Sequence, residues 1–384
     1  MTRSYIHHAA TVNSLGNDRD TCLHHLEQQR IAPTRLTVAH LNEPRSFPYF
    51  RLSDPAAIAA QSESRLLAWL RLLLNDTFAA YPLSDTERQR TGLFLASSSV
   101  GIESAEAIYR QQLQRDPGTA IPVPQAAYHE IGETLALEFG LSPCAYTVMT
   151  ACTSAANALL FAHTMLQAGR LDHALVIGAE MFNEISTLGF LGLELISATG
   201  EILPFDKRRN GLVLGEGIGL MLLSREPAAH LVALCGGASN TDCFSPTSAN
   251  PDGSSIAHVI RATLHNSGTT PAQVRAVKVH GTASQGNDES EARGLLQVFP
   301  DGITAYALKP FIGHTLGACA AIETVLSLHA LQAGFIPATT GIGNGSDAFA
   351  LTLNQIPMPA ASGRYLLNYF AFGGNNTALV LEKP

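Results

Sequence analysis

The segment TACTSAANALLFAHTMLQAG (residues 150–169) reappears in altered form 165 positions later, as TLGACAAIETVLSLHALQAG (315–334). Seven of the twenty aligned positions are identical, including the closing LQAG. Each copy follows a strand-like run and continues as an apolar helix, which is typical of a strand–turn–helix unit. The match is either a coincidence between two apolar helices or the trace of a duplicated fold. We favour the duplication, with an N-terminal half at residues 1–225 and a C-terminal half at residues 226–384.

The rest of the chain alternates between strand-like and helical segments. The strand-like runs are HALVIGAE (173–180), VRAVKVHGT (274–282), GITAYALK (302–309) and RYLLNYFAFGG (364–374). The helical runs are SESRLLAWLRLLLNDTF (62–78), AANALLFAHTMLQAG (155–169) and CAAIETVLSLHALQAG (319–334). This alternation predicts an α/β fold in which helices pack on parallel or mixed sheets.

The composition narrows the class of protein. Of 384 residues, 46% are hydrophobic and only 15% are charged, which indicates a large buried core. A net charge of −8 argues against a nucleic-acid binder. The apolar runs are short or interrupted by charge and the N-terminus lacks an apolar signal, so we expect no membrane span. The six cysteines have no CxxC spacing, which favours reduced thiols in a cytoplasmic protein.

Cys152 stands where the first copy of the repeat turns from strand to helix. A thiol in the first helical turn lies near the positive end of the helix dipole, so its pKa is expected to fall and its nucleophilic thiolate form to increase. The alternative is a cysteine that serves packing, because free cysteines are among the most buried residues. The segment alone does not decide between these two uses.

Two histidines strengthen the catalytic interpretation. His280 and His314 each leave a strand-like run beside a glycine, and His314 lies in the turn equivalent to that of Cys152. Catalytic groups gather at the carboxyl ends of strands in α/β folds. Lys309 and Glu323 flank His314 in the sequence and could form a buried pair that orients its imidazole. A zinc site is the competing use of Cys and His, but no ligand pair has the short zinc spacing.

Three further motifs have simple structural interpretations. In GNDESEA (286–292), Asp288 or Asn287 is expected to cap a helix, with Glu291 completing a capping box. The segment LPFDKRRNGLVLGEGIG (203–219) is rich in glycine but lacks the GKS or GKT ending of a phosphate-binding loop. Its glycines therefore fit tight turns and close backbone packing. Gly373 and its neighbouring glycine predict a hairpin turn that could also bring a backbone N–H group into a site.

Taken together, these motifs resemble those of the β-ketoacyl-acyl carrier protein synthases, the condensing enzymes of the thiolase-like fold. The resemblance rests on five segments in order: TACTSA (150–155), PFDKRRNGLVLGEGIG (204–219), HGTASQGND (280–288), KPFIGHTLGACA (309–320) and AFGGNN (371–376). It implies an α/β fold of two pseudo-twofold-related halves in α-β-α-β-α layers. It also implies a carbon–carbon bond-forming acyltransferase that needs no cofactor of its own, because its substrates arrive on the phosphopantetheine of an acyl carrier protein.

The resemblance assigns a role to each reacting group. Cys152 would accept an acyl group as a thioester, and malonyl carrier protein would then lose CO2 to give the attacking carbanion. His280 and His314 would donate hydrogen bonds to the thioester oxygen as the enolate develops. Lys309 and the more remote Glu323 would fix the arrangement of the histidines.

Other positions are implied to bind the substrate. The backbone N–H groups of Cys152 and Phe372 would form the oxyanion hole, with Gly373 shaping that turn and the Phe372 ring gating the acyl pocket. Thr282 and Ser284 would hydrogen-bond the pantetheine arm. Carrier proteins are acidic, so a basic patch is expected to receive them. That patch is predicted at Lys207, Arg208 and Arg209, with Arg65 and Arg71 from an early helix.

The departures from the family motifs point to a specialised branch. Ala283 replaces a glycine of HGTGT, Thr153 replaces a serine of TACSS, and Ala371 replaces the first glycine of the late motif. A fatty acid, polyene or polyketide pathway would use such an enzyme, as a homodimer or as a heterodimer with a related subunit. The alternatives are a non-catalytic chain-length-factor-like partner, which would lack the nucleophile, and a thiolase, which would carry a second cysteine late in the chain.

Overall fold

The structure is a computed structural model that describes residues 3–31, 33–38, 43–59, 64–116, 118, 128–341 and 351–384. Its strands are β1 (Ser4–Val12), β2 (Thr34–Val38), β3 (Arg45–Phe50), β4 (Thr91–Ala96), β5 (Ala145–Val148), β6 (His173–Glu180), β7 (Leu214–Gly215), β8 (Gly217–Ser224), β9 (Ala233–Thr241), β10 (Val274–Lys278), β11 (Thr304–Tyr306), β12 (Phe335–Ile336), β13 (Thr352–Leu353), β14 (Met358–Pro359), β15 (Gly363–Phe370) and β16 (Asn375–Lys383). Its α-helices are α1 (Arg19–Glu27), α2 (Ala56–Ala59), α3 (Arg65–Ala80), α4 (Asp85–Gln89), α5 (Ile102–Arg115), α6 (Glu130–Glu138), α7 (Ser154–Gln167), α8 (Glu184–Gly192), α9 (Ser254–Asn266), α10 (Gln285–Val298), α11 (Lys309–Ile312) and α12 (Cys319–Ala333).

The two halves repeat one strand order. The N-terminal half runs β5-β4-β6-β8-β1, and the C-terminal half runs β11-β10-β15-β16-β9 with β13 added at its edge. In both halves the first two pairings are parallel and the last two are antiparallel. A short antiparallel pairing of β1 with β9 joins them. This shared order supports the division after residue 225, which we retain as a proposal.

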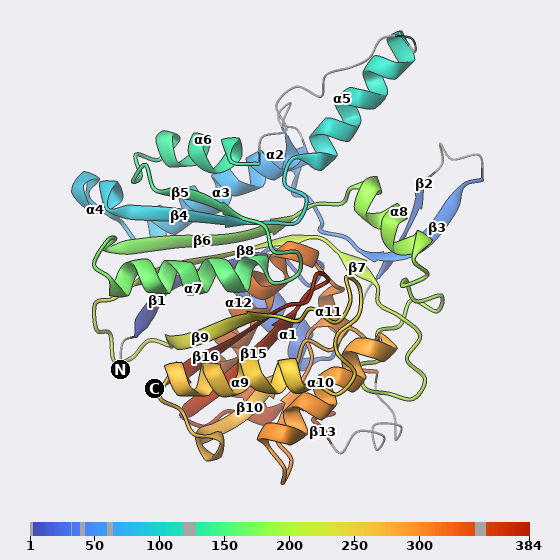
Figure 1. Cartoon of the computed structure of the whole chain (residues 1–384). Coiled ribbons are helices and arrows are strands. Elements are labelled where there is room, and N and C mark those ends of the chain that lie inside the picture. Colours follow the sequence, from blue (N-terminus) through green and yellow to red (C-terminus); the bar gives the residue numbers. More distant parts are fainter. Residues whose placement is uncertain are drawn as a thin grey trace.

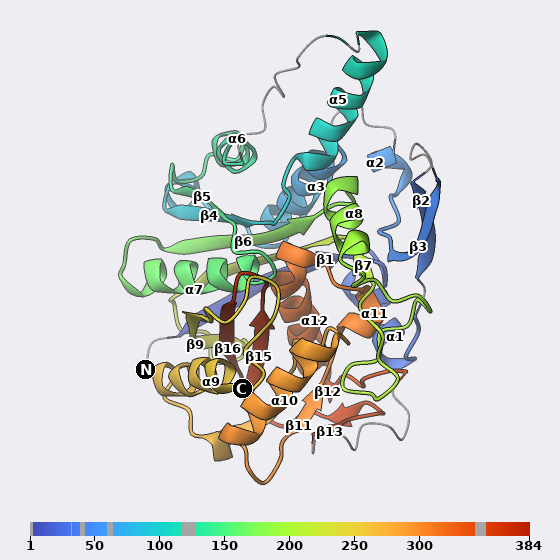
Figure 2. The same cartoon turned by 45° about the vertical axis from the view of Figure 1, so that its right-hand side comes forward.

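Helices and sheets form the expected α-β-α-β-α layers. Figures 1 and 2 show α7 and α12 between the sheet of the N-terminal half and that of the C-terminal half. In Figure 1, α3 and α6 lie on the outer side of the first sheet, and α9 and α10 cover the outer side of the second. The two central helices, α7 and α12, lie in the matching segments 150–169 and 315–334 of the sequence repeat. The predicted α/β fold, with helices and sheets in alternating layers, is therefore confirmed.

The central helix α12 explains the most apolar window of the chain. Every residue from Cys319 to Leu331 is buried. The window Leu316–Ala333 has a mean hydropathy of 1.3, enough by composition for a membrane span, but 89% of it is buried inside the protein. A helix that is apolar on all sides is also what a layer between two sheets requires. We therefore assign its apolar character to the core.

The two corners that precede the central helices share an unusual backbone. Ala151 has φ of 50°, and Leu316, its equivalent 165 positions later, has φ of 44°. Left-handed backbone is uncommon at residues other than glycine and clusters at functional sites. The match in conformation supports the equivalence of the two corners, and it places Cys152 directly after a strained residue.

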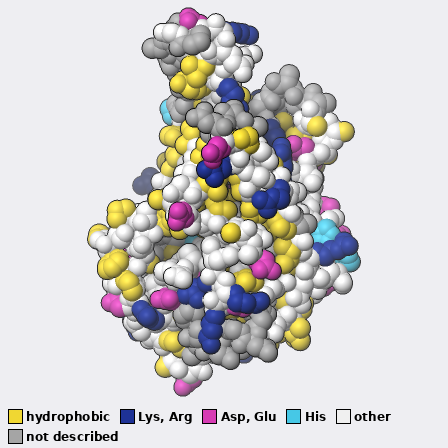
Figure 3. All heavy atoms as spheres, turned by 90° about the vertical axis from the view of Figure 1, so that its right-hand side faces the viewer, with side chains coloured by type: hydrophobic (Ala, Val, Ile, Leu, Met, Phe, Trp, Pro, Cys, Tyr) yellow, Lys and Arg dark blue, Asp and Glu magenta, His cyan; other side chains and the backbone are white. Residues whose placement is uncertain are grey.

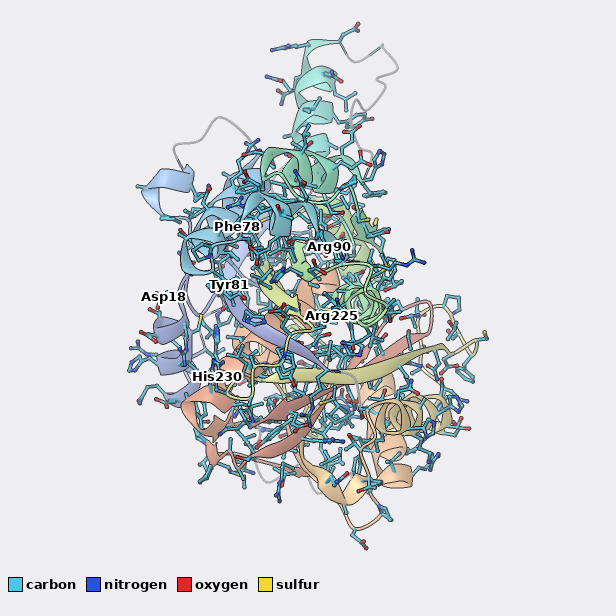
Figure 4. The ribbon with its side chains drawn as sticks, turned by 90° about the vertical axis from the view of Figure 1, so that its left-hand side faces the viewer. Asp18, Phe78, Tyr81, Arg90, Arg225 and His230 are labelled. Carbon is cyan, nitrogen blue, oxygen red and sulfur yellow. The ribbon has the colours of Figure 1, made fainter. Side chains whose placement is uncertain are left out.

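The site lies at the carboxyl ends of the parallel strands. Figure 4 views the opposite end of the molecule, where Arg90 and Arg225 are labelled. Arg90 precedes β4 and pairs with Asp172, which precedes β6, so both strands begin on that face. Their other ends lead to Ser97 and Glu180, next to the Cys152 corner.

One local prediction is wrong. The helix of GNDESEA begins at Gln285 with Ser284 at its N-cap, so Asp288 and Glu291 lie inside α10 and form no capping box. Both carboxylates are fully buried and bind backbone N–H groups of neighbouring loops instead. The tertiary contacts of these side chains outweigh their local capping preference.

Candidate active site

Cys152 lies beside a histidine from the other half of the chain. It precedes α7, is only 7% exposed, and its Sγ lies 3.1 Å from Nε2 of His314. His314 follows α11, where its backbone N–H donates to Val213 and its carbonyl accepts from Gly215. The duplication therefore brings one corner from each half into contact.

His280 completes a compact pair of imidazoles. Its ring lies 5.4 Å from that of His314, at an interplanar angle of 87°. Both side chains are buried, and burial, followed by the positive charge of Lys309, lowers the pKa of each well below the usual value. Both histidines are therefore neutral at physiological pH, and each can offer one N–H group to a substrate oxygen.

Lys309 determines the tautomer of His280. Its Nζ lies 2.7 Å from Oε1 of Glu323 and 3.3 Å from Nδ1 of His280. Burial is the largest single influence and lowers the pKa of Lys309, but the charge and hydrogen bond of Glu323 together with the nearby Cys319 and Cys152 outweigh it, so the net shift is upward and the side chain stays an ammonium donor. An ammonium group can only donate, so Nδ1 of His280 accepts and the proton resides on Nε2. The predicted Lys309–Glu323 pair is present, but it contacts the ring of His280 and not that of His314, which it was expected to orient.

The expected fall in the pKa of Cys152 does not occur in the free protein. Burial raises the pKa of its thiol to about 12, and the Lys309 charge and the backbone N–H groups of Cys152 and Phe372 only partly offset this. The free energy needed to remove a thiolate from water is larger than the stabilisation that the N-terminal end of a helix gives it. The thiol is therefore held neutral beside His314 until a substrate arrives.

Two cavities meet at Cys152. One, of about 260 Å³, is lined by both histidines, Thr282 and Ser284, and by polar residues such as Asn287. The other, of about 280 Å³, has mostly apolar walls that include Ile185, Phe190, Leu193 and Leu316. Cys152 and Phe372 line both cavities, and the Phe372 ring stacks on Phe190 with centroids 5.7 Å apart. The ring therefore stands where a gate between the cavities would stand.

Gly373 shapes the turn that carries Phe372. It has φ of 81° and lies in the hairpin between β15 and β16, where its N–H donates to the carbonyl of Pro246. The hairpin that the paired glycines predict is confirmed. Thr282 and Ser284 share a hydrogen bond of 2.9 Å at the wall of the polar cavity.

The sequence analysis missed several buried groups around the site. Glu180 accepts from Ser98, which follows β4, and from Gly317, and so joins the end of β4 to the second corner. Glu291 accepts from the backbone N–H groups of His280 and Gly281. A second lysine, Lys278, binds the free oxygen of Glu323, and Cys319 donates to the carbonyl of Cys152. Cys319 lies inside KPFIGHTLGACA and Glu291 inside GNDESEA, but neither pattern indicated these contacts, and Glu180 lies far from all five family segments.

The predicted basic patch is corrected in part. Arg65 turns inward, with only 24% of its side chain exposed, and binds Asp54 and the fully buried Glu216. Arg209 is 8% exposed and binds Glu289. Both guanidinium groups neutralise carboxylates of their own chain. Lys207 is exposed, and the exposed Arg208 is paired with Asp206, so the structure leaves Lys207 as the accessible member of the run 207–209.

Comparisons with known proteins agree with this geometry. The family model Beta-ketoacyl synthase, N-terminal domain, matches residues 50–229, and Beta-ketoacyl synthase, C-terminal domain, matches residues 231–342. The 3-oxoacyl-[acyl-carrier-protein] synthase 2 of Mycobacterium bovis is 30% identical over 325 residues, which cover 79% of this chain and 77% of the relative. The enzyme of the same name from Vibrio cholerae is 26% identical over 321 residues, 78% of each chain.

Solved structures are similar over the whole chain. A ketosynthase in complex with its chain length factor from Xenorhabdus doucetiae has a TM-score of 0.84 and 26% identity, and the match covers 100% of this chain and 98% of that one. The ishigamide ketosynthase/chain length factor has a TM-score of 0.87 at 22% identity, with 100% and 99% covered, which is a likeness of fold.

Proposed function

The chain belongs to the β-ketoacyl synthase family and is an acyltransferase that forms carbon–carbon bonds, and from this premise we propose how its residues perform the reaction. Acyl and malonyl groups arrive in turn on the phosphopantetheine arm of an acyl carrier protein. The observation that carries the proposal is the contact of Cys152 with His314, 3.1 Å apart, in a buried site that also holds His280.

The first half-reaction transfers the acyl group to the enzyme. The Cys152 sulfur attacks the carbonyl carbon of the acyl thioester, and the pantetheine sulfur leaves with the proton of the thiol. The backbone N–H groups of Cys152 and Phe372, which both face the Cys152 sulfur, stabilise the oxyanion of the tetrahedral intermediate. Phe372 then moves aside to admit the acyl chain to the apolar cavity.

The second half-reaction forms the new bond. The malonyl thioester enters along Thr282 and Ser284 and loses CO2, and its electron pair becomes an enolate. The Nε2–H groups of His280 and His314 donate to the thioester oxygen as charge develops there, which is most effective away from water. The enolate carbon attacks the acyl carbon, the new carbon–carbon bond forms, and Cys152 leaves as a thiolate. Lys309 acts as a positioning residue through His280.

A partner subunit is proposed at the edge of the N-terminal sheet. Strand β5 is the terminal strand there, and its residues are half-buried. Met149 and Phe161 beside it are each 38% exposed, and an unpaired edge with apolar neighbours is a ready site for another chain. A second copy or a related subunit would pair with β5. The relative from Xenorhabdus doucetiae is a complex with a chain length factor, which supports the second form.

The carrier protein is proposed to dock on the face drawn in Figure 3. Lys and Arg side chains lie there together with hydrophobic side chains below the projecting α5. This charge fits an acidic carrier protein even though the enzyme has a net charge of −8. Lys207 is the residue we assign to that contact. A cytoplasmic location and membership of a polyene or polyketide pathway stay predictions.

A non-catalytic partner role is the second candidate. Such a subunit would lack the nucleophile, whereas this chain has Cys152, His280 and His314 in one buried site. The thiolase alternative is weaker still, because AFGG (371–374) carries no late cysteine.

The test offers the enzyme acyl carrier proteins of several chain lengths, followed by malonyl carrier protein. Intact-mass analysis is expected to show an acyl adduct that vanishes in Cys152→Ala and persists in Cys243→Ala, a matched change at an exposed cysteine. If no adduct forms, or Cys152→Ala condenses as well as the parent enzyme, the proposed function is wrong.

A further inference from the structure

A second buried lysine stands behind the catalytic pair. Lys278 ends β10, two residues before His280, and its side chain is fully buried. Its Nζ lies 2.5 Å from Oε2 of Glu323 and 2.7 Å from the carbonyl oxygen of Asn368. The same nitrogen lies 3.6 Å from the centroid of the Tyr369 ring, which is cation–π distance. Lys278 is thus held by partners on two other elements, α12 and β15.

Lys278 and Lys309 each donate to a different oxygen of the Glu323 carboxylate. Oε1 of Glu323 accepts from Lys309 and Oε2 accepts from Lys278. Lys309 in turn donates to Nδ1 of His280. Lys278, Glu323, Lys309 and His280 therefore form one continuous chain of hydrogen bonds that ends on an imidazole of the site.

Charge balance alone does not require Lys278. One lysine neutralises Glu323, and a second buried ammonium group adds a desolvation cost. A carboxylate with one partner can rotate about its terminal bond, whereas one held at both oxygens keeps a single orientation. The excess positive charge also acts on both histidines, since Lys278 lowers the pKa of His280 and of His314.

We propose that Lys278 is a positioning residue for the condensation half-reaction, which orients Glu323 so that Lys309 meets His280. This inference rests on the proposed function, because it assigns a role within the same reaction. The inference also goes beyond the proposed function, because it adds to the site a residue, Lys278, that contacts neither the substrate nor the Cys152 sulfur.

The proposal predicts a dependence on pH. Burial lowers the pKa of Lys278 to about 8, in spite of the charge of Glu323. Below that pH the protonated lysine donates to the carboxylate, and above it the donor is progressively lost. The titratable groups that interact with it are Glu323, Lys309, Cys319, Tyr369, Glu291, His280 and His314.

The experiment compares Lys278→Met and Lys278→Arg with the parent enzyme. Lys383→Met is the matched control, since this lysine binds only the carbonyl of Ala360 near the C-terminus. Acyl-adduct formation on Cys152 and condensation with malonyl carrier protein are measured separately, from about pH 6 to about pH 9.5. Thermal unfolding shows whether each variant is folded.

Lys278→Met is expected to form the acyl adduct at nearly the parent rate and to condense at least about tenfold more slowly. Its condensation profile is expected to lose the decline near pH 8, which Lys278→Arg would move to higher pH. In the background of Glu323→Gln, Lys278→Met is expected to have no further effect, because both changes break the same chain.

The outcomes separate the two proposals. A parent enzyme that forms no adduct or no condensation product contradicts the proposed function. A working parent with Lys278→Met that condenses normally, slows both half-reactions equally, or adds its full effect to that of Glu323→Gln contradicts the role of Lys278. A variant that fails to fold leaves Lys278→Arg and its pH profile as the deciding measurement.

Discussion

Glu291 holds the backbone of His280: its two oxygens accept from the N–H groups of His280, at 2.8 Å, and Gly281, at 2.9 Å. His280 is thus fixed both through its ring, by Lys309, and through its main chain. Glu291 lies inside α10, so the helix and the end of β10 are coupled by this carboxylate.

Glu291 is expected to make stability depend on pH with a defined sign. Burial raises the pKa of its carboxyl group from 4.5 to about 7. Its contribution to the free energy of unfolding is therefore full below about pH 4.5 and is lost as the pH rises through about 7. The stability difference between the parent and Glu291→Gln, which does not titrate, should shrink between about pH 5 and about pH 8. Chemical denaturation at both pH values measures this, and a difference that grows contradicts the assignment.

Cys152 is expected to react slowly with alkylating reagents in the free enzyme. Because burial raises the pKa of its thiol to about 12, the rate with iodoacetamide should keep rising through about pH 10 and not level off near the ordinary thiol value. Lys309→Met should slow the reaction further at each pH, since the Lys309 charge is the largest influence that lowers this pKa. Peptide mass analysis follows both Cys152 and the exposed Cys243, whose rate should not respond to Lys309→Met.

Arg65 and Lys207 are expected to separate stability from carrier docking. Arg65→Met leaves the buried Glu216 without its main cation and should lower the free energy of unfolding by about 3 kcal/mol. Lys207→Glu should leave stability unchanged and raise the KM for carrier-linked substrates, more so at low salt. Denaturant titrations and steady-state kinetics measure the two effects. A stable Arg65→Met enzyme with weakened carrier binding would restore the docking role that the structure removes from Arg65.

Gly317 is expected to tolerate no side chain. A Cβ there would lie 2.3 Å from the backbone nitrogen of Ser98 and 2.5 Å from the carbonyl carbon of Ser97. Gly317→Ala must therefore push the second corner away from Ser97 and Ser98, at a cost of about 1–3 kcal/mol, and it should reduce acyl-adduct formation on Cys152. Gly192→Ala is the control, because a Cβ at Gly192 meets nothing within 4 Å. Equal melting temperatures for the two variants would contradict the close approach.

The sequence predicted the layers, and it selected three residues, Cys152, His280 and His314, that the structure places in one site, because both signals are encoded locally. HALVIGAE spans β6 without error, and CAAIETVLSLHALQAG gives α12 except for its last residue. Cys152 and His280 each follow a strand, so their convergence could be inferred from the rule that strand ends meet, whereas His314 follows the short helix α11 and was expected to leave a strand.

What the sequence did not reveal are the effects of burial and of partners distant in the chain. Lys278 and Glu291 look like ordinary charged residues of a strand and a helix, and only the packing of α12 and the β10 loop gives them their roles. Arg65 looked like a surface charge, but Glu216, 151 positions away, draws it inward. The pKa of Cys152 was mispredicted because the helix end is visible in the sequence and the degree of burial is not.

The paired left-handed corners at Ala151 and Leu316 record a division of labour. In the first corner the next residue is the nucleophile, and in the second it is Gly317, whose N–H instead binds Glu180. The first corner carries the sulfur atom of Cys152. The second corner carries no reactive side chain; it is held to the rest of the site by Glu180, and the residues just before it include His314. We therefore expect neither half to be active by itself, and a split of the chain between Ser224 and Ala233 should give fragments that recover activity only on reassociation.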